Sequence, residues 1–240
     1  MTDKEYFEAL CRADGDTVHR RDGIGRVSEK RLHRIIKSYV SCDPSSHETP
    51  VGRYIADALW DGEIFEIQTK AFTRLAPKLE YYLKETPYRI NVIYPVIRNR
   101  RLIRIDPETG EILRNKTSPK HGRSADLLPE LFYLRHLLPN ERIKIKLMFI
   151  DAEEYRYSER VRYRRSGAYD SELFPVSLVD IEEYSSPDDF LRFIPSDRDS
   201  FTAAEYSKFI KLTGRRLYAA LALLCSLGLL RKEGKTYRRA

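Results

Sequence analysis

The stretch 53–70, RYIADALWDGEIFEIQTK, decides how the rest of the chain is interpreted. Two extended, apolar-rich runs flank Asp61-Gly62, and Asp-Gly in this setting is the strongest short-range signal for a β-hairpin with a primed turn. The turn places Trp60 opposite Glu63. Because side chains alternate with period two, counting outward predicts four further pairs on one face: Leu59 with Ile64, Asp57 with Glu66, Ile55 with Gln68 and Arg53 with Lys70.

The pairing of Asp57 with Glu66 predicts a site for a metal ion. Directly opposed side chains lie about 4.5 to 5.5 Å apart at Cβ. Two carboxylates that close repel unless a proton or a cation lies between them, and all-oxygen sites suit hard divalent ions such as Mg²⁺ or Mn²⁺. The alternative is a solvated face, which usually opposes unlike charges because like charges across a pair are destabilising. The hairpin therefore predicts half of a metal site.

An Asp on one strand, Glu-x-Gln on the next and a helical segment after it resemble the PD-(D/E)xK nuclease superfamily. Restriction endonucleases and archaeal Holliday-junction resolvases belong to this superfamily. The resemblance implies that Asp57, Glu66 and the main-chain carbonyl of Ile67 bind Mg²⁺ or Mn²⁺. Most members carry a Lys two residues after the Glu, which orients the attacking water. Here that position is Gln68, as in some restriction enzymes of the superfamily.

A lysine from the following helix is the superfamily's other known solution, and two lysines could supply it. Lys78 follows Arg74 by one turn in the helix predicted over 73–84, and Lys70 is nearer in sequence. Both stay open as candidates.

The resemblance also suggests a third carboxylate. Glu29 follows Ser28, which can cap a second predicted helix, and it resembles the acidic residue that many of these nucleases place on the helix before the core sheet. A Glu in a first turn is also favoured by the helix dipole alone. Glu48, in the loop before the hairpin, is a rival donor.

Helical and strand patterns alternate after the hairpin. The predicted order is a helix over 73–84 with Pro77 near its first turn, strands over 89–97 and 101–106 separated by a turn at Asn99, a turn over 106–110, a loop over 116–123, a helix over 127–137 and a strand over 142–151. This order predicts an α/β fold with a mixed sheet flanked by helices, which is the restriction-endonuclease-like fold.

The C-terminal stretch has its own pattern. Thr202-Ala-Ala-Glu205 is a capping box that predicts a helix through 210, and a second helix over 213–227 ends at Gly228. A β-wing turning at Gly234 follows. The pattern resembles a winged helix-turn-helix. It predicts two domains, a nuclease-like domain over 1–196 and a winged-helix domain over 197–240.

Basic residues predict the contacts with DNA. The run 156–165 interleaves arginines, which neutralise phosphates, with tyrosines, which can stack on exposed bases. In the helix-turn-helix family the start of the second helix enters the major groove. The predicted DNA-contacting residues are Arg53, Arg74, Arg160, Arg162, Arg164, Arg165, Arg215, Arg216, Lys232 and Lys235.

Composition agrees with a nucleic-acid partner. The 240 residues carry a net charge of +7, and such basic surfaces favour nucleic acids or anionic membranes. No apolar run approaches the roughly 18 to 20 residues that a membrane span needs, and the first residues lack the apolar core of a signal peptide. Three scattered cysteines without zinc or redox spacing indicate a reducing compartment. We expect a cytoplasmic protein without a membrane partner.

Together these patterns predict a metal-dependent endonuclease that cleaves double-stranded or branched DNA, with a homodimer left open. Two alternatives belong to other classes. One is a non-cleaving DNA-binding regulator on the same scaffold, and the other is an interaction subunit of a defence or repair complex.

Overall fold

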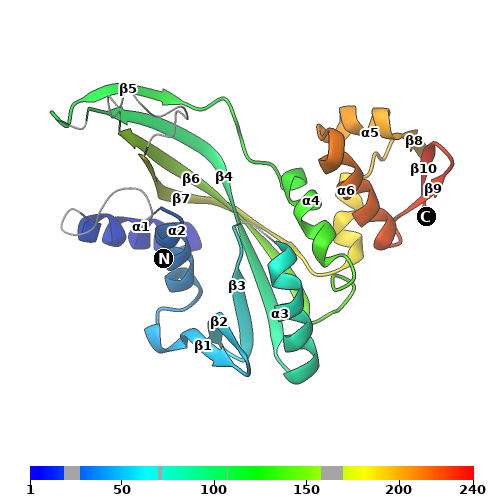
Figure 1. The fold of residues 1–240 in the computed structure, drawn as a ribbon, viewed down its shortest axis with the longest axis horizontal. Coiled ribbons are helices and arrows are strands. Elements are labelled where there is room, and N and C mark those ends of the chain that lie inside the picture. The colour runs from blue at the N-terminus through cyan, green and yellow to red at the C-terminus, as the bar shows by residue number, and fades with distance from the viewer. Residues whose placement is uncertain (19–27, 70–71, 107, 158–169) are drawn as a thin grey trace, which may run out of the picture. The chain divides into compact units, whose positions relative to one another are not determined.

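A computed structural model describes residues 1–18, 28–69, 72–106, 108–157 and 170–240. The fold is mixed α/β. Its large sheet has the strand order β1-β2-β3-β4-β6-β7, with β5 paired to β4, and it combines the antiparallel pair β2/β3 with the parallel pair β3/β4 (Figure 1). The prediction of a mixed sheet flanked by helices is confirmed at this level. The chain divides into two compact units, which are described in turn.

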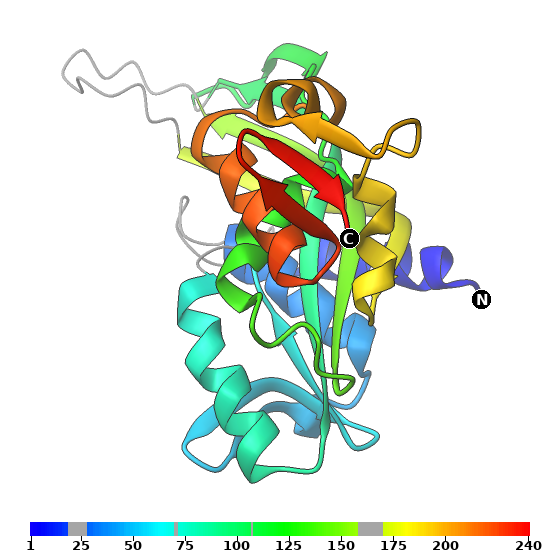
Figure 2. The ribbon, with the colours of Figure 1, turned by 90° about the vertical axis from the view of Figure 1, so that its right-hand side faces the viewer.

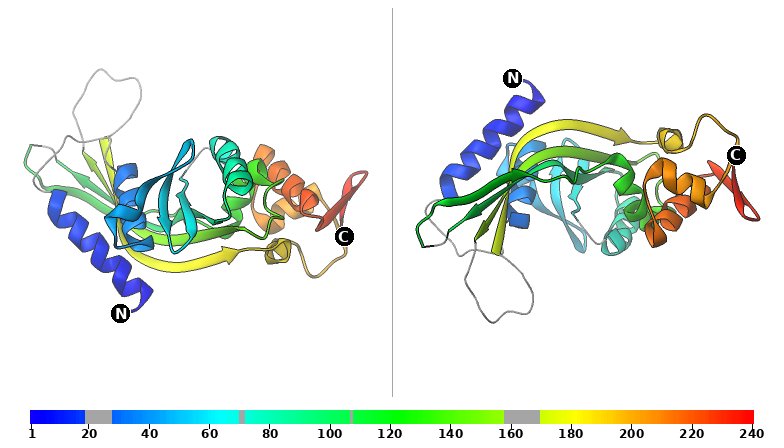
Figure 3. Two further views of the ribbon diagram at one scale, coloured as in Figure 1. Left: turned by 90° about the horizontal axis from the view of Figure 1, so that it is seen from below. Right: turned by 90° about the horizontal axis from the view of Figure 1, so that it is seen from above.

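The first unit comprises Met1–His47, Pro95–Gly122 and Met148–Ile181. Helices α1 (Asp3–Val18) and α2 (Ser28–Val40) pack on each other, as Figure 3 shows in blue. The side chains of Phe7 and Ile36 are fully buried, and the hydroxyl of Tyr6 donates to the carbonyl of Ser38 at 3.0 Å. The predicted start of α2 at Ser28 is confirmed.

Long strands complete the first unit and correct two predictions. Strand β4 runs unbroken from Arg89 to Ile105, so the predicted turn at Asn99 is wrong. At this position Oδ1 of Asp151 accepts hydrogen bonds from both the main-chain and the side-chain N–H groups of Asn99. Strand β5 (Ile112–Thr117) was not predicted, and the loop expected from residue 116 begins only after it. All its residues are exposed, so no buried alternation marks it.

The remaining strands of the first unit are β6 (Ile143–Tyr157) and β7 (Asp170–Tyr184), each of which continues into the second unit. Strand β6 extends beyond its predicted end, and β7 was not predicted. The turn predicted over 106–110 is confirmed, because the N–H of Gly110 donates to the carbonyl of Asp106 at 2.9 Å.

The second unit comprises Glu48–Tyr94, Arg123–Leu147 and Glu182–Ala240. It begins with β1 (His47–Val51), β2 (Tyr54–Trp60) and β3 (Glu63–Ile67), followed by α3 (Phe72–Glu85). The predicted helix is confirmed, but it starts at Phe72, so Pro77 lies inside it rather than in its first turn. Buried Phe72, Leu75, Leu79 and Tyr82 form the packed stripe of α3.

The helix predicted over 127–137 is wrong as a single element. It is divided into η2 (Ser124–Leu127), α4 (Leu128–Leu131) and η3 (Phe132–Leu134). The N–H of Leu137 donates to the carbonyl of Leu134, three residues back, as in a 3₁₀-helix. This tighter winding replaces the expected regular helix. A further 3₁₀-helix, η4 (Pro187–Phe193), follows β7.

The C-terminal elements follow the predicted pattern closely. Thr202 caps α5 (Ala203–Ile210): its hydroxyl accepts from the N–H of Glu205, and the Glu205 carboxylate accepts from the N–H of Thr202. Helix α6 (Gly214–Ser226) follows. Strands β8 (Ser200–Thr202), β10 (Thr236–Arg239) and β9 (Leu230–Glu233) form a small sheet in that order (Figure 2).

These elements belong to the same unit as the hairpin, since α6 packs on α4. The guanidinium of Arg123 also donates to the carbonyls of Ile210 and Lys211, at 3.1 and 3.3 Å. A separate domain over 197–240 stays a prediction. Among the described residues, no helix is long and apolar enough to cross a membrane.

Candidate functional site

The hairpin of β2 and β3 forms, and its three paired positions have the predicted register. Trp60 pairs with Glu63, Leu59 with Ile64 and Ala58 with Phe65. Asp61 and Gly62 have φ values of 50° and 73°, and positive φ at both central residues is the requirement of a type I′ turn. The regular ladder ends at Ala58 and Phe65, one residue before Asp57 and Glu66.

Asp57 is tied to the strand that carries Glu66. Its Oδ2 accepts a hydrogen bond from the N–H of Ile67 at 2.7 Å. The Asp57 side chain is half-buried, whereas Glu66 is 3% exposed. The two carboxylates are therefore held on adjacent strands, one of them almost without solvent.

Helix α3 supplies the polar partners of Glu66. The Nζ of Lys78 lies 2.6 Å from Oε2 of Glu66, and the hydroxyl of Tyr82 donates to Oε1 at 3.2 Å. Residues four apart lie on the same face of a helix, so Lys78 and Tyr82 reach the same carboxylate together. Tyr82 is fully buried, while the Lys78 side chain is 18% exposed. Figure 1 shows the helix beside the strands of this unit.

The pKa of Glu66 is raised from 4.5 to about 7. Burial is the main cause and the charge of Asp57 adds to it, while Lys78 and Tyr82 lower the pKa and so limit the rise. Burial and the neighbouring carboxylates also raise the pKa of Tyr82, which keeps its hydroxyl a hydrogen-bond donor. A carboxyl with a pKa near 7 exchanges its proton close to neutral pH, as groups at functional sites often do.

The donor set fits a hard divalent cation. Asp57 and Glu66 offer carboxylate oxygens, and the negative charge of Asp57 raises the pKa of Glu66. A cation between them would offset that repulsion. Within the described residues, no group of three or more His, Cys, Asp or Glu side chains is placed to hold a metal ion. In that part of the chain, Asp57 and Glu66 are therefore two carboxylates without a third such side chain placed to complete a metal site.

The comparison with protein families places this site in a known group of sequences. A family model described as "Domain of unknown function (DUF8091)" matches residues 30–186, more than half of the chain. The chain belongs to the DUF8091 family. The matched part contains the hairpin and α3, and hence Asp57, Glu66, Lys78 and Tyr82. The C-terminal elements from β8 onward lie outside the DUF8091 match.

One relative of this DUF8091 chain is an "Uncharacterized protein" of Treponema pallidum (strain Nichols). It is 33% identical over 158 residues, which cover 64% of this chain and 61% of the relative. The chain thus spans less than two thirds of the length of that relative. No solved structure matches this chain.

The other predicted site residues are Gln68, Glu48, Glu29 and Lys70. Gln68 is half-buried, and its N–H donates to the carbonyl of Ile93, so the pairing of β3 with β4 continues to this residue. Glu48 begins the second unit, with a φ of 50°. Glu29 lies in the first turn of α2, in the first unit, and its side chain is outside the described set. Lys70 lies outside the described residues.

The predicted DNA-contacting residues are only partly described. The guanidinium of Arg53 lies 4.8 Å from the ring centre of Tyr81, and Arg74 is exposed on α3. Arg215, Arg216, Lys232 and Lys235 are all exposed in the C-terminal elements. Arg216 also contacts Asp126, with its guanidinium 3.3 Å from Oδ1. Arg160, Arg162, Arg164 and Arg165 lie outside the described residues.

Tyr82 is the site residue that sequence reasoning missed. Its place in the apolar stripe of α3 predicts a core residue, and its ring is indeed buried. The available signal was its spacing of four from Lys78, since a lysine that reaches a buried carboxylate brings the residue one turn later to the same place.

Proposed function

We propose that this protein is a metal-dependent deoxyribonuclease of the PD-(D/E)xK type. The observation that supports the proposal best is the cluster of Asp57, Glu66 and Lys78. Two acidic residues lie on adjacent antiparallel strands, and the lysine from the following helix lies 2.6 Å from the second one. This combination of two carboxylates and one lysine is the one that the superfamily uses, and the helix supplies the lysine that the Glu-x-Gln sequence lacks.

Asp57, Glu66 and the carbonyl of Ile67 would hold Mg²⁺ or Mn²⁺. Such an ion, when bound, lowers the pKa of a coordinated water and stabilises negative charge on a phosphoryl group. Glu66 must give up its proton first, and Lys78 favours that step because it lowers the pKa of Glu66. Gln68, on the same strand face as Glu66, would orient the water by hydrogen bonding. Lys78 would provide the positive charge near the scissile phosphate.

The C-terminal elements would bind the duplex as a winged helix-turn-helix. Arg215 is exposed in the first turn of α6, the position that enters the major groove in that family. Lys232 and Lys235 are exposed on the hairpin of β9 and β10, which corresponds to the wing. Helix α5, α6 and this hairpin follow one another in the order that the motif requires.

A DNA-binding regulator without cleavage activity is the second candidate. It is favoured by the fact that both oxygens of Glu66 already have partners, Lys78 on one and Tyr82 on the other. In that case the cluster would be a closed structural ion pair, and the basic surface alone would act.

A cleavage assay separates the two candidates. Purified protein is incubated with supercoiled plasmid, a single-stranded oligonucleotide and a four-way junction, each with Mn²⁺, Mg²⁺ or EDTA. Metal-dependent cleavage that disappears in Glu66→Gln supports the nuclease. Binding of DNA without cleavage under every condition supports the regulator.

A further inference from the structure

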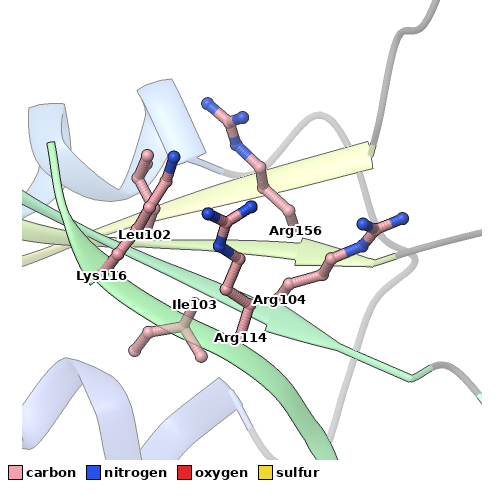
Figure 4. Close-up of a pocket in the computed structure, with 6 residues that line it drawn as sticks. All are labelled: Leu102, Ile103, Arg104, Arg114, Lys116 and Arg156. Atoms are coloured by element: carbon pink, nitrogen blue, oxygen red, sulfur yellow. The ribbon is translucent and has the colours of Figure 1, made fainter.

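A basic cavity lies in the first unit, on strands that the proposed active site does not use. It has a volume of about 170 Å³ and is lined by Leu102, Ile103 and Arg104 of β4, Arg114 and Lys116 of β5 and Arg156 of β6. Figure 4 shows the guanidinium groups of the three arginines reaching out on the same side of the sheet.

Strand pairing explains how the cations meet. Arg104 lies directly opposite Arg114 in the antiparallel ladder of β4 and β5, and Leu102 lies opposite Lys116. Alternation with period two therefore puts all four side chains on one face. Strand β6 also neighbours β4, and it brings Arg156 to the same cavity.

The pairing of Arg104 with Arg114 is unfavourable for the sheet itself. Like charges directly opposite each other are destabilising, and a solvated ladder normally alternates their signs. Among the described residues that line the cavity, four are cationic and none is acidic. Glu154 lies near the group, but it already serves two guanidiniums, those of Arg100 at 2.9 Å and Arg156 at 2.7 Å. Among the described residues that line the cavity, cationic side chains therefore outnumber carboxylates.

The chemistry of the cations selects the ligand. Guanidinium forks match phosphate oxygens with two parallel hydrogen bonds, and neighbouring forks can share one polyanion. The four charged side chains of the lining offer hydrogen-bond donors and no acceptor. Donors alone suit the sequence-independent backbone of a nucleic acid, whose phosphates repeat along the strand.

We infer that the cavity bounded by Arg104, Arg114, Lys116 and Arg156 binds backbone phosphates of a DNA duplex. The inference rests on the proposed function for the identity of the partner. It adds a binding site in the first unit to the predicted contacts of the second unit. Phosphates bound there would offset the repulsion between Arg104 and Arg114, which lie opposite each other on β4 and β5.

The test measures binding without metal, so that cleavage is not needed. Anisotropy of a fluorescent 24-base-pair duplex is recorded in EDTA across a salt series for the whole protein. We compare Arg104→Gln and Arg114→Gln with Arg101→Gln, a matched control on the same strand. Arg101 lies on the opposite face of β4 from Arg104, and its guanidinium donates to Asn115 and Glu153. Circular dichroism verifies that each variant is folded.

We expect Arg104→Gln and Arg114→Gln each to weaken duplex binding severalfold and to reduce the salt slope by about one unit, because one phosphate contact is lost. Arg101→Gln should match the wild type. Equal behaviour of all three variants would overturn the inference. It would also be overturned if duplex binding were unchanged while calorimetry showed that the two cavity variants had lost binding of pyrophosphate, since the cavity would then serve a free phosphate compound.

Failure of this inference is distinguishable from failure of the proposed function. Duplex binding that depends on the cavity, in a protein that never cleaves DNA, would leave the cavity assignment and remove the nuclease. Metal-dependent cleavage by a protein whose duplex binding does not change in the cavity variants would support the nuclease and remove the cavity assignment.

Discussion

The ammonium group of Lys78 lies 2.6 Å from the carboxylate of Glu66, so the cation beside the buried carboxylate comes from α3 and not from β3. In the motif of the resembled superfamily the lysine follows the glutamate by two residues. Here Gln68 occupies that position, and the helix brings its lysine from twelve residues away. In both arrangements a lysine lies beside the second of two carboxylates.

Asp57→Asn and Glu66→Gln should each reduce Mn²⁺-dependent cleavage by at least about 100-fold, because each removes a carboxylate of the donor set. The thermal stability of metal-free Asp57→Asn should hold or rise, since Asn can still accept the hydrogen bond from Ile67 while the repulsion with Glu66 disappears. Cleavage rates and thermal melts check both. Asp61→Asn in the exposed turn is the matched control and should behave as the wild type. Wild-type cleavage rates in both site variants would show that the site is elsewhere.

The stability of the metal-free protein should fall as pH rises through 7. The pKa of Glu66 is about 7 in the folded state and near 4.5 when the chain is unfolded, so the folded state binds the proton more tightly. This contribution is fully present below pH 4.5 and is lost above pH 7, with a magnitude of about 3 kcal/mol. Urea melts from pH 4 to pH 9 measure it, and Glu66→Gln should remove it. A difference between the two proteins that does not change with pH would contradict the raised pKa.

The affinity for Mn²⁺ should rise with pH, because the same proton on Glu66 must leave before the ion binds. A carboxylate must be deprotonated to bind a cation, so Mn²⁺ should bind about tenfold more weakly for each pH unit below 7 and show little change above pH 8. Calorimetry in buffers of different ionisation enthalpy should report about one proton released near pH 6. Binding without proton release would mean that the ion does not use Glu66.

Lys78→Ala should reduce cleavage more than Gln68→Lys does, because the second change restores the residue that the superfamily normally uses. Loss of Lys78 also removes a charge that lowers the pKa of Glu66, so the pH at which residual activity is half-maximal should move upward. Lys84→Ala, in the last turn of the same helix and 82% exposed, is the control. Full activity in Lys78→Ala would transfer the role to Lys70, and full activity without either lysine would favour the regulator.

The hairpin shows how far local sequence determines structure. Asp61-Gly62 allows positive φ at two successive residues, which fixes the turn, and the turn fixes the register of Trp60 and Glu63. The contact of Asp57 with the strand of Glu66 then follows by counting. The capping box at Thr202 was predictable for the same reason, since the residues that form it are three apart.

The missed features depend on partners distant in sequence. Strand β5 is exposed along its whole length and is held by its ladder with β4, so no buried alternation reveals it. At Asn99, where a turn was predicted, β4 continues and the side chain is bonded to Asp151, 52 residues away. The role of Tyr82 likewise depends on a carboxylate 16 residues earlier, which a helical periodicity does not contain. Each of these requires the tertiary structure.

The last prediction concerns the first turn of α6, where two adjacent arginines differ in their surroundings. Both are exposed, but Arg216 contacts the carboxylate of Asp126, at 3.3 Å, near the helix α4 on which α6 packs. Arg215→Ala should therefore weaken duplex binding and lower the salt slope by about one unit, as expected for the loss of one phosphate contact. Arg216→Ala should change the slope less, because part of its charge is already directed to Asp126.

Point substitutions test this better than a truncation after Ser196, since removal of α6 would uncover α4 and the guanidinium of Arg123. Anisotropy titrations of the two single variants across a salt series, with thermal melts to verify folding, make the comparison. Lys208→Ala, in the last turn of α5, serves as the charge-matched control. If Arg215→Ala binds the duplex with the affinity and salt slope of the wild type, α6 does not enter the groove. The C-terminal elements would then serve a protein partner, and the cavity between β4, β5 and β6 would become the leading contact with DNA.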